Sequence, residues 1–188
     1  MQRSDLANMF RIAGFLPLWI LIAFAILLND IKYFRKFGFL TAIGRAVLLI
    51  LTTATAGALA ELIKVLVRRV RPSLELGSYE FRPFTNTEQY NWYESGNLGF
   101  PSSHTIVAFA AAFILCRFFP RAWFIWIIFA IGCAATRVLS QGHFLSDTVA
   151  AALFAFAITR FYWFWHLYNQ RKLIDELDGK LPFESSLS

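Results

Sequence analysis

Long apolar runs with almost no charge constrain this chain more than any other feature of its sequence. Five such runs occur, over about residues 12–28, 46–67, 104–119, 122–138 and 143–168. Helices of this kind can cross the hydrocarbon core of a bilayer, because their backbone polar groups are paired within the helix. Charged residues make up only 16% of the 188 positions. We therefore predict an all-α, polytopic transmembrane helix bundle of five to six spans, built as one domain over residues 1–188.

Two polar segments lie outside these runs, a loop over residues 73–100 and a tail over residues 169–188. Alternating spans bring the ends of the second and fourth runs to the same membrane surface as the starts of the third and fifth. Lysine and arginine away from that surface gather in the 29–45 connector, in the turn with Arg117 and Arg121, and in the tail. Because cytoplasmic segments carry an excess of these residues, we expect the shared surface to face outward. The basic residues behind the net charge of +6 are then explained by membrane topology and by contacts with anionic lipid headgroups. This explanation argues against a nucleic-acid partner.

Ionisable residues near the ends of the runs indicate a functional site, because charges at membrane depth are costly. Lys64, Arg68 and Arg71 are spaced i, i+4 and i+7 at the end of the second run. On a helix this spacing predicts one cationic stripe. Cations that snorkel to the interface and set topology would explain the stripe equally well.

Two further clusters flank the later runs. Ser102 or Ser103 is expected to cap the helix that begins at His104, and the free backbone N–H groups at a helix start bind anions. Arg137 closes the fourth run, and Asp147 follows His143 by four residues at the start of the fifth. A carboxylate within reach of an imidazole fixes its tautomer and supports it as a nucleophile. Taken singly, each cluster is also compatible with an interfacial histidine or a local helix-start hydrogen bond.

Together the three clusters favour a phosphate-binding catalytic site. Guanidinium groups hold phosphate oxygens, and fixed positive charge stabilises a phosphoryl-transfer transition state. A histidine nucleophile and a second histidine as acid complete the set. The sequence shows no cluster of carboxylates for a divalent metal, so we expect chemistry without a metal or other cofactor.

The same residues give the chain a resemblance to the type 2 phosphatidic acid phosphatase superfamily. The first part of that signature reads Lys64-VLVRRV-Arg71-Pro72, the second Pro101-Ser102-Ser103-His104, and the third Thr136-Arg137-VLSQG-His143-FLS-Asp147. Two positions depart from the family pattern, because Ser103 replaces a glycine and Thr136 replaces a serine. The resemblance extends from the second run through the fifth.

The resemblance implies a role for each matching residue. His143 would attack phosphorus to form a phosphohistidine, with Asp147 orienting it. His104 would protonate the leaving oxygen and then activate water. The phosphate would be held by Lys64, Arg71, Arg137, Ser102 and the backbone of Ser103, and the stripe argument adds Arg68.

The resemblance also implies a membrane lipid phosphate as substrate. Candidates are undecaprenyl pyrophosphate, phosphatidylglycerophosphate, phosphatidic acid and a lipid A phosphate, at the outer face of a bacterial inner membrane. Transfer of the phosphate to a second lipid is an alternative, as is a non-catalytic lipid-binding or transport role on the same fold. Related vanadate-dependent haloperoxidases are soluble, so the apolar runs argue against that activity.

Overall fold

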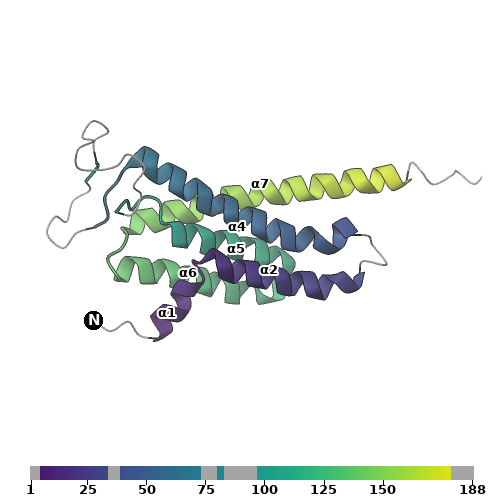
Figure 1. Cartoon of the computed structure of the whole chain (residues 1–188), viewed down its shortest axis with the longest axis horizontal. Helices are drawn as coiled ribbons and strands as arrows, with labels where there is room; N and C mark the ends of the chain where they lie inside the picture. Colours follow the sequence, from purple (N-terminus) through teal and green to yellow (C-terminus); the bar gives the residue numbers. More distant parts are fainter. Residues whose placement is uncertain (1–4, 34–38, 73–79, 83–96, 179–188) are drawn as a thin grey trace, which may run out of the picture.

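The computed structural model describes residues 5–33, 39–72, 80–82 and 97–178, which form a bundle of helices (Figure 1). The helices are α1 Asp5–Ile12, α2 Leu16–Asp30, α4 Phe39–Val67, α5 Ser103–Phe118, α6 Trp123–Leu139 and α7 Leu145–Asp178, with short 3-10 turns η1 Ile31–Tyr33 and η2 Pro120–Ala122. Among the described residues there is no strand, only two isolated bridges, Arg69 to Phe81 and Val70 to Leu98. The predicted all-α bundle is confirmed.

The helices α2, α4, α5, α6 and α7 coincide with the five apolar runs. Three segments of the described chain are long and apolar enough to cross a membrane, Ile43–Val67, Pro120–Leu139 and Leu145–Lys172, while α2 and α5 are shorter apolar helices. Large apolar side chains also cover the outside of the bundle, for example Leu153 at 66% and Phe161 at 67% exposed. Such a surface suits lipid tails, and the chain is an integral membrane protein.

Helix α5 lies at the centre of the bundle and packs against α4, α6 and α7. Its inner residues include the three consecutive buried alanines Ala110, Ala111 and Ala112. Small side chains allow neighbouring helix backbones to approach closely in a membrane. The central position of α5 matters for the site, because His104 lies in its first turn.

Before the first apolar run, the structure adds a short helix that the sequence analysis did not predict. Helix α1 has eight residues, so at about 1.5 Å per residue it is too short to cross a bilayer. It packs against α6, where the Phe10 ring contacts Gly132 and lies edge-on to Phe129 at 5.6 Å between centroids. The following turn is held by a hydrogen bond of 2.9 Å from Trp19 Nε1 to the Ala13 carbonyl.

Helix α7 continues to Asp178, beyond the expected end of the fifth run near residue 168. The first part of the predicted polar tail is therefore helical, since residues such as Gln170, Arg171 and Lys172 are good helix formers. Figure 1 shows α7 extending past the other helices at the end opposite the one where α4 ends. Most of the predicted 73–100 loop and residues 179–188 lie outside the described residues.

Candidate active site

The three signature segments meet at the end of the bundle where α4 ends and where α5 and α7 begin (Figure 1). Backbone hydrogen bonds hold them together. The Gly99 N–H donates to the Arg69 carbonyl at 2.7 Å, and the Ser102 N–H donates to the Asp147 carbonyl at 3.3 Å. These bonds join residues that are far apart in the sequence into one site.

His143 lies in the bend between α6 and α7 and is only 2% exposed. Its Nδ1 lies 2.7 Å from the Gly99 carbonyl oxygen. A carbonyl only accepts hydrogen bonds, so Nδ1 carries the proton and Nε2 presents a lone pair. Burial, together with the nearby positive charge of Arg137, lowers the pKa of His143 to about 3, so the ring is neutral near pH 7.

Asp147 is fully buried in the first turn of α7, but it is not the direct hydrogen-bond partner of His143 that the spacing suggested. Its Oδ2 lies 3.6 Å from His143 Nδ1 and instead accepts the Phe144 N–H at 2.8 Å. The reason is that His143 precedes α7, which begins only at Leu145. The Gly99 carbonyl therefore fixes the tautomer, and Asp147 contributes negative charge close behind the ring.

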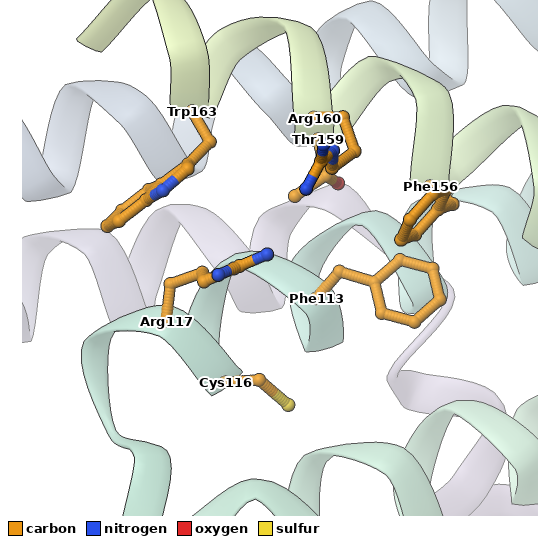
Figure 2. A pocket seen from close by; sticks show the side chains of 7 residues that line it. All are labelled: Phe113, Cys116, Arg117, Phe156, Thr159, Arg160 and Trp163. Carbon is orange, nitrogen blue, oxygen red and sulfur yellow. The ribbon is translucent and has the colours of Figure 1, made fainter. Parts of the chain in front are cut away.

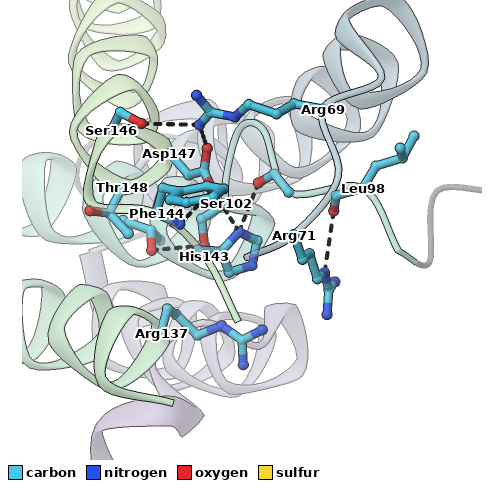
Figure 3. A network of polar contacts seen from close by, with 12 residues as sticks. Arg69, Arg71, Leu98, Ser102, Arg137, His143, Phe144, Ser146, Asp147 and Thr148 are labelled. Carbon is cyan, nitrogen blue, oxygen red and sulfur yellow. Dashed lines mark hydrogen bonds and ion pairs between the residues drawn. The ribbon is translucent and has the colours of Figure 1, made fainter. Parts of the chain in front are cut away.

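Arg69 is a site residue that the sequence analysis missed. It forms an ion pair with Asp147, and it donates to Ser146 Oγ at 3.1 Å. Its guanidinium lies 4.7 Å from the Phe100 ring centroid and 5.4 Å from that of Phe144. Buried between these rings and paired with the carboxylate, Arg69 holds Asp147 in place behind His143 (Figure 3).

The predicted helical stripe of Lys64, Arg68 and Arg71 is wrong, because only Lys64 of these three residues lies in α4. Helix α4 ends at Val67, and Arg68 has a φ of 56°, in the left-handed region that ends helices. The chain then runs extended towards Pro72, a residue that disfavours helical geometry just before it. Arg68 is buried, but the helical spacing that suggested it as a phosphate ligand does not exist.

Lys64 is buried near the end of α4 and is joined to the start of α5 through a shared carboxylate. Its Nζ lies 2.8 Å from Glu61 Oε1, and the Ser103 hydroxyl donates to the same oxygen at 2.6 Å. This bridge fixes the ammonium group of Lys64 relative to the first turn of α5.

Arg137 and Arg71 both place positive charge that acts on His143. Figure 3 shows both guanidinium groups on the side of the His143 ring that faces away from Asp147. Arg71 Nε donates to the Leu98 carbonyl at 3.4 Å, and Arg137 is buried in the last turn of α6. A Cβ at Gly142 would lie 3.3 Å from the Arg137 guanidinium, so the glycine leaves room for it. Together with Lys64, these charges act on both His143 and His104.

Ser102 occupies the N-cap position of α5 and is fully buried, although its side chain makes no capping hydrogen bond. Its hydroxyl instead accepts from Thr105 Oγ1 at 3.0 Å. The first backbone N–H groups of α5, including that of Ser103, have no partner within the helix, as at any helix start. They lie beside His104 and keep the predicted anion site geometrically available.

His104 packs against the turn that joins α1 to α2. Its ring meets the Phe15 ring edge-on at 4.8 Å between centroids, and Gly14 lies directly against its Cβ. Within the described part of the chain, His104 Nε2 is buried and has no hydrogen-bond partner. An imidazole held this way has a nitrogen available for proton transfer.

In the residues that the structure describes, His, Cys, Asp and Glu do not gather in a group of three or more. The cofactor-free mechanism nonetheless stays a prediction, which the assay below tests directly.

A comparison with protein families matches residues 45–171 to the model described as the PAP2 superfamily. The chain belongs to the PAP2 superfamily. The match includes every residue of the three signature segments and ends before the last turns of α7.

Curated relatives match over about half of the chain. Two of them are named lipid A 1-phosphatase. The protein from Rhizobium johnstonii is 35% identical over 56% of this chain and 41% of its own length. The protein from Rhizobium etli is 35% identical over 55% of this chain and 42% of its own length. A bacitracin transport permease protein BcrC from Bacillus licheniformis is 26% identical over 57% of this chain and 52% of its own. The matched segment thus spans about half the length of these relatives, and no solved structure matches the chain.

The two departures from the PAP2 pattern have different consequences in the structure. Ser103, in place of glycine, adds the hydroxyl that bonds to Glu61. Thr136, in place of serine, donates its hydroxyl to the Cys133 carbonyl within α6 at 2.7 Å. The α1–α2 turn that contacts His104 lies before the PAP2 match, so it is a part of this site that the family pattern does not describe.

Proposed function

We propose that the chain is a membrane lipid phosphatase that hydrolyses a phosphomonoester or pyrophosphate of a lipid headgroup through a phosphohistidine intermediate. One arrangement carries the proposal. His143 is neutral, its proton is held at Nδ1 by the Gly99 carbonyl, and the guanidinium groups of Arg71 and Arg137 lie across its open side. This combines a free nucleophilic nitrogen with charges that attract a phosphate.

In the first step, His143 Nε2 attacks phosphorus and the bond from phosphorus to the lipid oxygen breaks. Arg71, Arg137 and Lys64 hold the equatorial oxygens, where negative charge is spread in the transition state. The imidazolium form of His104, which the incoming phosphate anion stabilises, donates a proton to the departing lipid oxygen and becomes neutral. The imidazolium character that develops on His143 is stabilised by Asp147, whose Oδ2 lies 3.6 Å from Nδ1.

In the second step, His104 takes a proton from water, and the hydroxide oxygen attacks phosphorus. The bond from His143 Nε2 to phosphorus breaks, which releases inorganic phosphate and restores the neutral ring. The α5 N-terminus, with Ser102 and the Ser103 N–H, supports the phosphate through both steps.

The substrate is an amphiphile whose phosphate reaches the membrane surface while its chains stay in lipid. The two relatives named lipid A 1-phosphatase support a lipid A phosphate as the first candidate. Undecaprenyl pyrophosphate, phosphatidylglycerophosphate and phosphatidic acid are the others. We place the protein in a bacterial inner membrane with the site facing the periplasm or cell exterior, because Arg117, Arg121 and Arg171 lie towards the other surface.

The test is phosphate release by purified protein in detergent, with EDTA present, against these four lipid phosphates. Release from at least one lipid, lost in His143→Ala, is the expected result. A folded protein that releases no phosphate from any of them would refute hydrolysis. Transfer of labelled phosphate to a second lipid in the same mixture would instead identify a phosphotransferase.

A further inference from the structure

Away from the catalytic end, a cavity of about 190 Å³ opens between α5 and α7 (Figure 2). The residues that line it include Phe113, Arg117, Phe156, Thr159, Arg160 and Trp163. Arg117 lies 13 positions after His104 on the same helix, which corresponds to about 20 Å along the axis. The cavity is therefore separate from the phosphate site described above.

Two arginines give the cavity a positive lining without an opposing carboxylate. The Arg117 guanidinium lies 5.6 Å from the Trp163 ring centroid, and the Arg160 guanidinium lies 4.5 Å from that of Phe164. Among the described residues neither arginine forms an ion pair, and no acidic residue lines the cavity. A guanidinium stacked on a ring keeps its N–H edge available to an oxygen anion.

Thr159 provides a second, independent sign of a ligand. It is 4% exposed and lines the cavity beside Arg160, its neighbour on α7 (Figure 2). Its Oγ1 is buried and has no hydrogen-bond partner in the part of the chain that the structure describes. Leaving a buried hydroxyl unpaired is unfavourable, so a ligand oxygen in the cavity would satisfy it.

The lining changes character along the membrane normal. Helices α5 and α7 both start at the catalytic end, so lower numbers on each lie closer to that end. Phe113 and Phe156 each precede one of the arginines by four residues, which places them about 6 Å deeper in the bilayer. Their rings meet edge-on at 5.8 Å. The cavity is thus apolar at its deep end and cationic towards the opposite surface.

We propose that this cavity binds the phosphate of an anionic phospholipid from the leaflet opposite the catalytic end. The phosphate contacts Arg117, Arg160 and the Thr159 hydroxyl, and the acyl chains follow Phe113 and Phe156 into the hydrocarbon region. Phe156 is 51% exposed, so the cavity opens onto the lipid-facing surface. Snorkelling would account for two arginines at this depth, but not for the unpaired hydroxyl and the space beside them.

The experiment measures lipid binding by native mass spectrometry of the purified full chain in detergent, titrated with dioleoyl phosphatidylglycerol or dioleoyl phosphatidylcholine. The R117Q/R160Q variant is compared with R121Q/R171Q, which removes the same charge from exposed positions outside the cavity. Thr159→Val removes only the hydroxyl and keeps the side-chain shape. Inorganic phosphate and glycerol 3-phosphate are added as competitors.

We expect one phosphatidylglycerol molecule to bind per protein, more tightly than phosphatidylcholine does. Its affinity should fall about tenfold or more in R117Q/R160Q, since charge-assisted hydrogen bonds are the stronger kind. Thr159→Val weakens it by a few fold, and R121Q/R171Q leaves it unchanged. Equal loss in R121Q/R171Q, or wild-type binding by both R117Q/R160Q and Thr159→Val, would overturn the proposal. If inorganic phosphate displaced the bound phosphatidylglycerol as efficiently as lipid does, the proposal that the ligand is a lipid would be overturned. Binding does not depend on catalysis, so the outcome is independent of the proposed phosphatase activity.

Discussion

Gly14 offers a sharp test of whether the turn between α1 and α2 supports His104. A Cβ at this position would lie 2.5 Å from His104 Cβ and 2.9 Å from its Cδ2. Carbon atoms in contact are normally about 3.5–4.0 Å apart, so Gly14→Ala requires a displacement of about 1 Å. The turn cannot easily move, because hydrogen bonds of 3.0 Å from Gly14 N to Arg11 O and 2.9 Å from Phe15 N to Ile12 O hold it.

The expected cost of Gly14→Ala has two parts. Overpacking of this kind destabilises a protein by about 1–3 kcal/mol. If the displaced group is His104, a shift near 1 Å lowers kcat by about 10–100-fold, since catalytic geometry is sensitive to misplacement on that scale. The loss in kcat is expected to exceed any change in KM, because the new methyl group meets His104 and not the side chains of Lys64, Arg71 or Arg137.

The assay measures kcat and KM for the best lipid phosphate, together with thermal unfolding in the same detergent. Gly57→Ala is the matched control, because a Cβ at Gly57 would lie 3.4 Å from Val107 Cγ2, an ordinary contact. Gly57 lies inside α4, so alanine there should leave kcat unchanged and raise stability by up to about 1 kcal/mol. Wild-type kcat in a folded Gly14→Ala protein would refute a supporting role for the turn.

Three further predictions concern the nucleophile and its surroundings. His143→Ala should abolish phosphate release and formation of the acid-labile phosphoprotein while leaving the protein folded. Normal turnover by this variant would refute the mechanism. Asp147→Asn should lower the unfolding free energy by about 3–5 kcal/mol, because it leaves the buried Arg69 without its charge partner; an unchanged melting temperature would contradict the ion pair. The pKa of His143 in the folded state, about 3, lies below its unfolded value near 6.5, so the unfolded state binds more protons at acid pH. Stability should therefore fall as pH drops from 6.5 towards 3, with a shallower slope in His143→Ala, measured as melting temperature against pH.

The five apolar runs were located from the sequence to within a few residues, except at the start of the second and the end of the fifth. Uninterrupted apolar composition is a local property, and it decides membrane insertion without reference to the rest of the fold. Helix α1 was not predicted because it is short and has a mixed composition. It is placed by packing of Phe10 against Gly132, which no local pattern reveals.

The ionisable residues that the structure brings together at the candidate site had also been selected from the sequence, with the exception of Arg69. The stripe argument selected Arg68 because it extended helical periodicity through residues that are not helical. Pro72 was the available signal, since a proline makes a helix end at or before the preceding residue, so Arg68 and Arg71 should not have been placed on one helical face with Lys64. Once α4 ends at Val67, it is Arg69 that pairs with Asp147.

The sequence alone determined that this chain is a membrane helix bundle and which ionisable groups lie near its surface, because hydropathy and signature spacing are properties of contiguous residues. Only the tertiary structure decided how those groups are paired. The Gly99 carbonyl rather than Asp147 holds Nδ1 of His143, and Arg69 rather than solvent neutralises Asp147. Such pairings join segments far apart in the chain, and they follow from how α4, α5 and α7 pack together, because spacing gives the face of a helix but not the neighbour that faces it.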